Sequence, residues 1–295
     1  MAQSDKDMVY FAEKYPRVFL NPSDVEQRWY HRILKPVFIA KENDLARIDR
    51  ELMDTGELDE TTGVFNMVSP NTSKKIWSFT HRTPLDLIKV IITGQDPYPP
   101  MFRGRKNEFE SDGLAFSTLH CGNSLPDNNV LKRIFDAVTD QIEDPNLDMS
   151  RTTLDYWAWQ GVLLLNTGLT RGDESHTQLW MNITREIVVR VCNYVRARDV
   201  QRRPLGVLLW GFEAKYNFGR ILSRHCHNNI TLTCRHPSAA ADKHFKGQPF
   251  AESNGHFAEI NDILEEMGKQ PIDWSTVPEE ERGGQSDDYW DYYNQ

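Results

Sequence analysis

The chain has 295 residues, of which 39% are hydrophobic and 26% charged, a composition typical of a soluble globular protein with one domain of ordinary size. No apolar run reaches the roughly 18 residues of a membrane span, and the first residues resemble neither a signal peptide nor a transit peptide, so we expect an intracellular protein without a membrane partner. The net charge of −9 argues at first sight against a nucleic-acid partner, but segments 41–60 and 275–295 each carry −5, which leaves +1 for the rest.

The N-terminal quarter of the chain is predicted to be helical after a polar start. Residues 1–22 form an N-terminal extension with an aromatic segment and no readable function. The spacing of Ser23 and Glu26 is that of a capping box and predicts the start of a helix. An acidic helix is expected around 41–53, with a turn near Gly56.

Four short apolar runs, rich in leucine and β-branched residues, predict strands buried on both faces of a parallel sheet. They are 87–92, 162–165, 206–210 and 230–233. The stretches between them are long enough for crossover helices, expected at 129–141, 177–196 and 212–224, with a closing helix at 256–267.

These elements predict an α/β fold: a single domain with a central four-stranded parallel sheet flanked by helices on both sides. The domain is expected to span 23–274. Residues 275–295 carry six acidic residues and late aromatic residues, and we expect an acidic, disordered C-terminal tail.

The cysteines favour buried, reduced thiols over a metal site. The chain has four, at positions 121, 192, 226 and 234, and no Cys-x-x-Cys pair. Zinc and iron–sulfur sites are therefore poorly supported, and we predict no metal ligands.

Polar residues follow each predicted strand. In chain order they are Gly94-Gln95-Asp96-Pro97-Tyr98, then Asn166, then Gly211, then Arg235-His236-Pro237-Ser238. Ligands of open α/β sheets bind beyond the carboxyl ends of the strands. An acid, a carboxamide and an imidazole are thus expected to converge on one edge of the sheet.

Taken singly, each of these residues has an ordinary interpretation. Asp96 before a proline is typical of a turn, and Asn166 after a strand is typical of a cap. His236 before a proline is more often structural, and 113–117 alone indicates a strand that packs Phe116 in the core.

The joint pattern is far more specific. Six short motifs occur in a fixed order along the chain. They are Gly-Gln-Asp-Pro-Tyr (94–98), Gly-Leu-Ala-Phe-Ser (113–117), Gly-Val-Leu-Leu-Leu-Asn (161–166), Leu-Leu-Trp-Gly (208–211), His-Pro-Ser (236–238) and Pro-Ile-Asp-Trp (271–274). Together they resemble the family 1 uracil-DNA glycosylases over roughly residues 25–274. The resemblance implies an enzyme that flips uracil out of DNA and hydrolyses its bond to deoxyribose, leaving an abasic site for base excision repair.

The resemblance also implies how uracil is bound. Phe116 would stack on the flipped base, and Asn166 would read its edge. Cytosine presents the opposite donor and acceptor pattern there, at a penalty of about 1–3 kcal/mol for each unpaired buried group. Tyr98 would exclude the methyl group of thymine, and the backbone of Gln95 would contribute to the pocket.

For the reaction, the resemblance makes Asp96 the acid that orients the attacking water and faces the cationic sugar. His236 would donate a hydrogen bond to uracil O2 as negative charge develops. Uracil is an acceptable leaving anion, so neither a metal nor another cofactor is implied. Ser238 and the backbone of Gly211 would grip DNA phosphates.

Several positions depart from the usual family pattern. Tyr98 is followed by Pro99 rather than histidine, a poxviral feature, and Phe212 stands where a phosphate-gripping serine is common. Ala239 and Ala240 replace the Pro-Leu pair whose leucine wedges into the emptied base stack. These changes predict a preference for single-stranded DNA unless another side chain supplies the wedge; the candidates are Phe245, Phe250, Met101 and Phe102.

Two other readings stay open from the residues. The first is a glycosylase-like accessory subunit of a polymerase, as in poxviral relatives. The second is a glycosylase for another lesion, such as a mismatch-specific enzyme, against which Tyr98 and Asn166 argue. Expected partners are uracil-containing DNA, a replication or polymerase protein and proteinaceous glycosylase inhibitors. We expect a monomer in the nucleus, the cytoplasm or a viral replication site.

Overall fold

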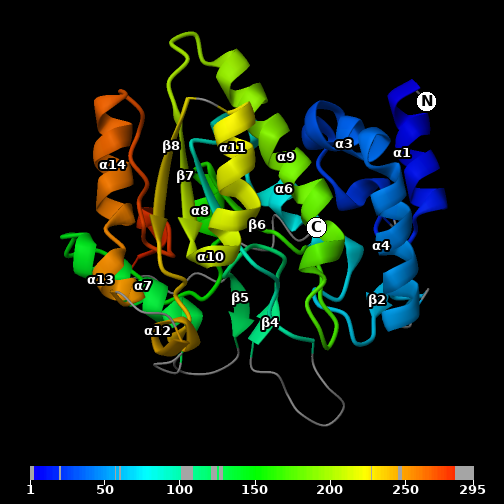
Figure 1. Ribbon diagram of the computed structural model, residues 1–295, viewed down its shortest axis with the longest axis horizontal. Helices are drawn as coiled ribbons and strands as arrows, with labels where there is room; N and C mark the ends of the chain where they lie inside the picture. The colour runs from blue at the N-terminus through cyan, green and yellow to red at the C-terminus, as the bar shows by residue number, and fades with distance from the viewer. Residues whose placement is uncertain are drawn as a thin grey trace.

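The centre of the protein is a four-stranded parallel sheet with the strand order β6-β3-β7-β8. The computed structural model describes residues 3–19, 21–56, 58–59, 61–100, 109–120, 125, 129–226, 228–244 and 248–282. The strands are β3 (Val90–Gly94), β6 (Val162–Asn166), β7 (Leu205–Trp210) and β8 (Asn229–Cys234). All four predicted strands are confirmed. Their carboxyl ends point toward a small hairpin formed by β4 (Phe109–Ser111) and β5 (Thr118–His120) (Figure 1).

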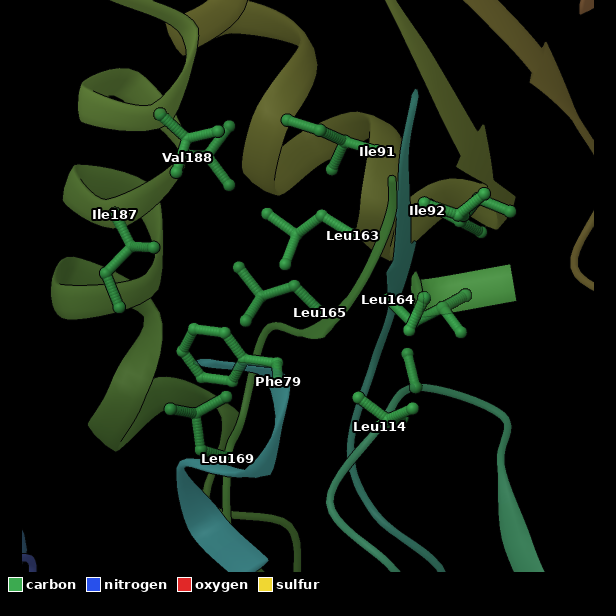
Figure 2. Packing of buried hydrophobic residues seen from close by; sticks show 14 of the residues in the cluster. Phe79, Ile91, Ile92, Leu114, Leu163, Leu164, Leu165, Leu169, Ile187 and Val188 are labelled. Carbon is green, nitrogen blue, oxygen red and sulfur yellow. The ribbon is translucent and has the colours of Figure 1, made fainter. Parts of the chain in front are cut away.

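The inner strands β3 and β7 and the edge strand β6 are buried on both faces, as their nearly unbroken apolar sequences require. Figure 2 shows the alternation of side chains along β6. Leu163 and Leu165 point toward Ile187 and Val188 of the long helix α9, and Leu164 points the other way. The other edge strand, β8, differs, because its residues Thr231 and Thr233 are exposed.

Helices cover both faces of the sheet (Figure 1). On one side lie α9 (Thr177–Arg198) and α11 (Arg220–His225), and on the other lie α7 (Val130–Gln141) and α14 (His256–Glu266). The predicted fold class, a single α/β domain with helices on both sides of a four-stranded parallel sheet, is confirmed. No helix among the described residues is both long and apolar enough to cross a membrane.

The predicted helix start at Ser23 is wrong. The reciprocal capping box is instead formed by Asn21 and Asp24 around a short 3-10 turn. The next helix, α2 (Gln27–Trp29), begins one residue after Glu26, whose carboxylate accepts the backbone N–H of Trp29. It continues through a π-helical turn, Tyr30–Leu34, into α3 (Lys35–Ala40).

The expected acidic helix is present as α4 (Glu42–Thr55), and the chain leaves it at Gly56. Before these helices, α1 (Gln3–Lys14) lies in the segment expected to be a polar extension. Met8 and Phe11 of α1 are buried in the hydrophobic core, and the ring of Phe11 packs edge-on against Phe38 of α3 with a centroid distance of 5.4 Å.

The first part of the expected C-terminal tail is packed against the domain. The indole N–H of Trp157 contacts the carbonyl oxygens of Trp274 and Ser275 at 2.9 Å each. Arg151 forms an ion pair with Glu281, whose carboxylate is buried. The structure therefore differs from the expected tail boundary at residue 275, because contacts with residues more than 100 positions earlier hold 275–282 in place. Residues 283–295 lie outside the described part of the chain.

The remaining described elements are short. They are η1 (Pro22–Asp24), β1 (Leu58–Asp59), β2 (Val64–Phe65), α5 (Ser73–Ile76), α6 (Ser78–Arg82), η3 (Leu85–Leu87), β4 (Phe109–Ser111), β5 (Thr118–His120), α8 (Asp155–Trp159), α10 (Gly211–Ala214), a π-helical turn (Lys215–Gly219), α12 (Ala239–His244), α13 (Phe250–Ser253) and η5 (Glu279–Glu281). The β4–β5 hairpin lies below the carboxyl ends of the sheet strands in Figure 1.

Candidate active site

The register of the sheet brings the polar strand ends together. Gly94, the last residue of β3, lies opposite Asn166, the last residue of β6. Trp210, the last residue of β7, lies opposite Cys234 of β8. The segments that begin at Gln95, Thr167, Gly211 and Arg235 therefore leave the sheet at the same edge, as the parallel topology predicts.

The loop after β3 is tied to the segment after β6. The carbonyl oxygen of Gln95 accepts the backbone N–H of Gly168 at 2.8 Å and the hydroxyl of Thr177 at 3.3 Å. These bonds fix the path of the chain at Asp96, whose carboxylate is partly exposed at the edge of the sheet. Its position is set by backbone bonds, not by a flexible loop.

Asp96 has a cationic neighbour that the sequence did not reveal. The Arg171 Nη1 atom lies 3.5 Å from Asp96 Oδ2. The backbone N–H and carbonyl of Arg171 both pair with Ser69 at 2.8 Å, so the arginine is anchored from a segment more than 100 residues away. An ion pair of this kind restricts the orientation of the carboxylate.

The side chain of Asn166 is buried, and the backbone of β3 passes directly against it. A Cβ atom added to Gly94 would stand 2.2 Å from the Asn166 Oδ1 atom and 3.1 Å from the Cβ of Ala115. Only glycine allows this approach. This close approach explains the glycine that opens the 94–98 motif.

Phe116 is held in a backbone conformation that aromatic residues rarely adopt. Its φ is +68°, in the left-handed region, which costs a non-glycine residue about 1–3 kcal/mol and persists where the surroundings impose it. The segment 113–117 is therefore a tight loop; the strand expected from its sequence alone is wrong. Backbone strain of this kind concentrates at functional sites.

A buried aspartate organises this loop. Asp112 accepts the N–H of Leu114 at 3.1 Å and the hydroxyl of Ser117 at 2.5 Å. Its charge is balanced by Arg82, whose Nη1 atom lies 3.0 Å away and whose Nε atom lies 2.9 Å from Asp155. Burial raises the pKa of Asp155, opposed by Arg82. The sequence motifs did not indicate Arg82 or Asp155, because these residues lie outside the motifs and support the loop through Asp112.

The Phe116 ring lies over Trp210 and beside His236. Its centroid is 5.3 Å from that of Trp210 and 6.3 Å from that of the imidazole. Trp210 is fixed from below, since its indole N–H donates to His256 Nδ1 at 3.0 Å. Tyr98 also contacts this group: its hydroxyl lies 3.5 Å from the Phe116 carbonyl oxygen, at the limit of a hydrogen bond. Burial raises the pKa of Tyr98, so its hydroxyl keeps its proton.

His236 is neutral and its tautomer is set. The backbone N–H of Ser238 donates to His236 Nδ1 at 3.0 Å, so the ring proton resides on Nε2. Burial lowers the pKa of His236, an effect that Asp96 opposes and Arg133 reinforces. Gly211 makes the position possible: its φ is +92°, and an added Cβ would stand 2.7 Å from the His236 Cβ. The imidazole therefore offers one N–H donor, at Nε2.

Of the residues expected to contact DNA, Ser238, Ala239 and Ala240 lie at the start of α12, and Gly211 is the first residue of α10. The Ser238 hydroxyl accepts the N–H of Ala241 at 3.3 Å and so caps this helix. Ala239 is half-buried and Ala240 is exposed. Of the four substitutes considered for the wedge, Phe250 is excluded, because it is fully buried and its ring packs edge-on against Trp210 at 5.6 Å. The other three, Phe245, Met101 and Phe102, lie outside the described residues.

A groove of about 830 Å³ lies at the opposite, amino edge of the sheet and is lined by Lys89, Trp159 and Lys269 among others. Of the residues in the sequence motifs, Pro271 alone lines this groove, and none of the predicted site residues does. The convergence of an acid, an imidazole, a carboxamide and an aromatic ring at the carboxyl edge identifies that edge as the candidate active site.

Sequence comparisons identify relatives of the chain among known proteins. No family model matches the chain. Over 226 residues the chain is 34% identical to the uracil-DNA glycosylase of bovine herpesvirus 1.1, an alignment that covers 75% of this chain and 96% of that protein. Over 217 residues it is 32% identical to the uracil-DNA glycosylase of Saccharomyces cerevisiae, covering 70% of this chain and 56% of the yeast protein, so that the chain spans little more than half of this relative.

Solved structures show the same fold. The crystal structure of mimivirus uracil-DNA glycosylase superposes with a TM-score of 0.65 at 20% identity and covers 90% of this chain and 93% of that one. A variant of the mimivirus enzyme, solved in complex with UGI, superposes with a TM-score of 0.63. On the sequence relationship to the herpesvirus protein, the chain belongs to the uracil-DNA glycosylase family.

Proposed function

We propose that the protein hydrolyses the bond between uracil and deoxyribose in DNA, with Asp96 and His236 as its catalytic residues. The observation that carries this proposal is the neutral His236, which offers its Nε2 proton at the same sheet edge as the carboxylate of Asp96. One group can stabilise a departing anion while the other faces the positive sugar.

Uracil recognition is assigned to three side chains and one backbone segment. The flipped base stacks on Phe116, whose ring packs against Trp210 with a centroid distance of 5.3 Å. The buried carboxamide of Asn166 supplies one donor and one acceptor to the uracil edge. Tyr98 stands against C5 and excludes thymine, and the backbone at Gln95 completes the pocket. Leaving either face of the buried carboxamide unpaired costs about 1–3 kcal/mol, and this penalty rejects cytosine.

The reaction needs one water and no other reactant. As the bond from C1′ to N1 breaks, its electron pair stays on uracil, and the charge that develops at O2 is stabilised by the Nε2 proton of His236. The sugar becomes positive at C1′ and faces the Asp96 carboxylate. A water oriented by Asp96 adds to C1′ and gives a proton to that carboxylate. The proton passes through solvent to the uracil anion, which leaves an abasic sugar and neutral uracil.

The proposed activity predicts release of uracil in excess chelator. The purified protein is incubated with a single-stranded oligonucleotide that contains one uracil, and free base and strand length are both measured. We expect free uracil and an intact abasic strand that breaks only on treatment with alkali. Activity that is abolished by chelator and restored by a divalent ion would contradict the mechanism, and so would direct strand cleavage by the protein.

The exposed Ala240 supports a preference for single-stranded substrate. Flipping a base from a duplex costs a few kcal/mol in lost stacking and pairing, which a single strand largely avoids. A leucine wedge would offset part of this cost. At about 0.8 kcal/mol per buried CH₂ group, alanine lacks roughly 1.5–2.5 kcal/mol of that contribution, or about 10- to 70-fold in rate on duplex DNA.

The variant Ala240→Leu should therefore raise the single-turnover rate on duplex DNA selectively, by up to about this factor of 10 to 70. Rates are measured on matched single- and double-stranded oligonucleotides, with Ala239→Leu as the neighbouring control. Equal wild-type rates on the two substrates, unchanged by Ala240→Leu, would show that this position is not where the wedge acts.

The solved complex of the mimivirus enzyme with UGI supports a further partner class. We propose that this chain also binds proteinaceous glycosylase inhibitors of that kind, in competition with DNA. The expected readout is loss of uracil release at equimolar inhibitor.

A further inference from the structure

Two aromatic side chains are exposed where the chain leaves β7, directly beside the proposed active site. Phe212 follows Gly211, on which an added Cβ would stand 2.7 Å from the His236 Cβ. Phe212 is 68% exposed and Tyr216 is 64% exposed. Their rings are stacked with a centroid distance of 5.8 Å and an interplanar angle of 16°. The pair therefore presents a flat aromatic surface to solvent at the carboxyl edge of the sheet.

The stacking follows from the local helix. Phe212 and Tyr216 are four residues apart, a spacing that places two side chains on the same face of a helix. The helix α10 (Gly211–Ala214) runs directly into the π-helical turn Lys215–Gly219, a conformation that occurs frequently at functional sites. Figure 1 shows α10 at the carboxyl end of β7. Single exposed apolar residues need no explanation, but a parallel exposed pair beside a reaction site does.

The surroundings of the pair are basic. Lys215, Arg220 and Arg224 are exposed on the same segment, against one acidic residue, Glu213. Behind them, Arg185 donates to the carbonyl and side-chain oxygens of Asn217 at 2.8 and 2.9 Å, both of them neutral partners. Although the whole chain carries −9, this surface is therefore locally positive, which suits a strand of phosphates.

We propose that Phe212, supported by Tyr216, is a stacking platform for a nucleobase that flanks the flipped uracil in the substrate strand. The proposal rests on the proposed function, because it places the platform along the same DNA strand. Stacking accepts any base, since every base has a π-face, and the surrounding cations hold the backbone. A flanking base in a single strand is free to stack on Phe212, whereas in a duplex it is held by its partner. The platform therefore adds to the single-strand preference.

Binding is measured by fluorescence anisotropy with a single-stranded oligonucleotide in which tetrahydrofuran replaces the uracil nucleotide, so that no reaction is needed. We expect Phe212→Ala to weaken binding about 5- to 150-fold, the effect of losing one base–aromatic stack. The variant Phe212→Trp should restore binding to within about 3-fold, because a larger ring also stacks. Trp159→Ala, which removes an exposed ring at the opposite edge of the sheet, should have no effect.

The flanking base is identified by a coupling experiment. The nucleotides on either side of the central position are replaced by tetrahydrofuran, one at a time. At one of these positions, removing the base should weaken binding by the wild type nearly as much as the Phe212→Ala substitution does on the intact strand. Removing the same base should weaken binding by Phe212→Ala only slightly further. Additive losses at both positions would overturn the platform, and so would equal affinities of wild type and Phe212→Ala for the intact strand.

The two proposals fail differently. If the wild type releases uracil from a single strand but Phe212→Ala binds as tightly as wild type, the platform is wrong and the proposed activity stands. If the wild type releases no uracil, the proposed activity is wrong, whereas a coupling between Phe212 and a flanking base would still identify a single-strand-binding surface.

Discussion

Asp96→Asn should lower the single-turnover rate of uracil release by about 10²–10⁴-fold, the range for a positioned acid–base group. Asparagine has nearly the same shape, so the fold and the bonds that fix the Gln95 backbone should persist. What is lost is the negative charge that faces the cationic sugar and the acceptor that orients water. Binding of uracil-containing DNA should survive, because a carboxylate close to phosphates is removed.

The matched control is Asp173→Asn. Asp173 is exposed in the same loop as Arg171, and only its backbone carbonyl contacts that arginine. The control therefore changes the local charge by the same amount without touching the reacting groups. Both variants are compared by single-turnover kinetics, DNA binding and circular dichroism. A near-normal rate for Asp96→Asn, or an equal loss in Asp173→Asn, would remove Asp96 from its assigned role.

The architecture could be predicted from the sequence because the strong signals are local. β3, β6 and β7 are nearly continuous runs of Val, Ile and Leu, and such runs are stable only when both faces are buried. The predicted positions of the strand ends were less accurate. Leu87, expected to begin the first strand, lies in a 3-10 turn and is 54% exposed, and β3 begins at Val90. The apolar character of a side chain does not by itself show whether the residue is buried in the core.

The meeting of the candidate site residues also follows from local information, once the sheet is parallel. Residues that follow parallel strands share an edge, so Asp96, Asn166 and His236 meet although 140 positions separate the first from the last. Their chemical roles stay predictions. The structure adds the reason for two glycines at the site. An added Cβ on Gly94 would collide with Asn166, and one on Gly211 would collide with His236.

Features set by distant contacts could not be predicted. The left-handed backbone of Phe116 lies in a loop held by Asp112, whose charge is balanced by Arg82. No sequence motif indicates that Arg82 and Asp112 form a pair. Arg171 reaches Asp96 only because its backbone pairs with Ser69. The residues directly after Trp274 were expected to be disordered because their composition is acidic. They are packed because they contact residues more than 100 positions earlier in the chain, which composition does not show.

His236→Ala should slow uracil release about 10²–10³-fold, the cost of removing one preorganised donor from a developing anion. The donor is preorganised because Nδ1 accepts the Ser238 N–H, which fixes the ring and leaves the proton on Nε2. Burial lowers the pKa of His236 below its ordinary value near 6.5, so the ring is neutral at pH 7 and acts by hydrogen bonding and not as a cation. Uracil-DNA binding should be retained, since the Phe116 and Asn166 contacts remain.

A change of leaving group separates this role from that of Asp96. A fluorine at C5 withdraws electrons and makes the departing base a more stable anion, which then depends less on the donor at O2. We expect the His236→Ala defect to shrink when 5-fluorouracil replaces uracil in the same oligonucleotide, and the Asp96→Asn defect to change little, because Asp96 acts on the sugar and the water. Single-turnover rates of three proteins on two substrates decide it. If the His236→Ala defect is the same on both bases, the imidazole does not stabilise the leaving anion; if both defects shrink together, the two residues act on the same charge.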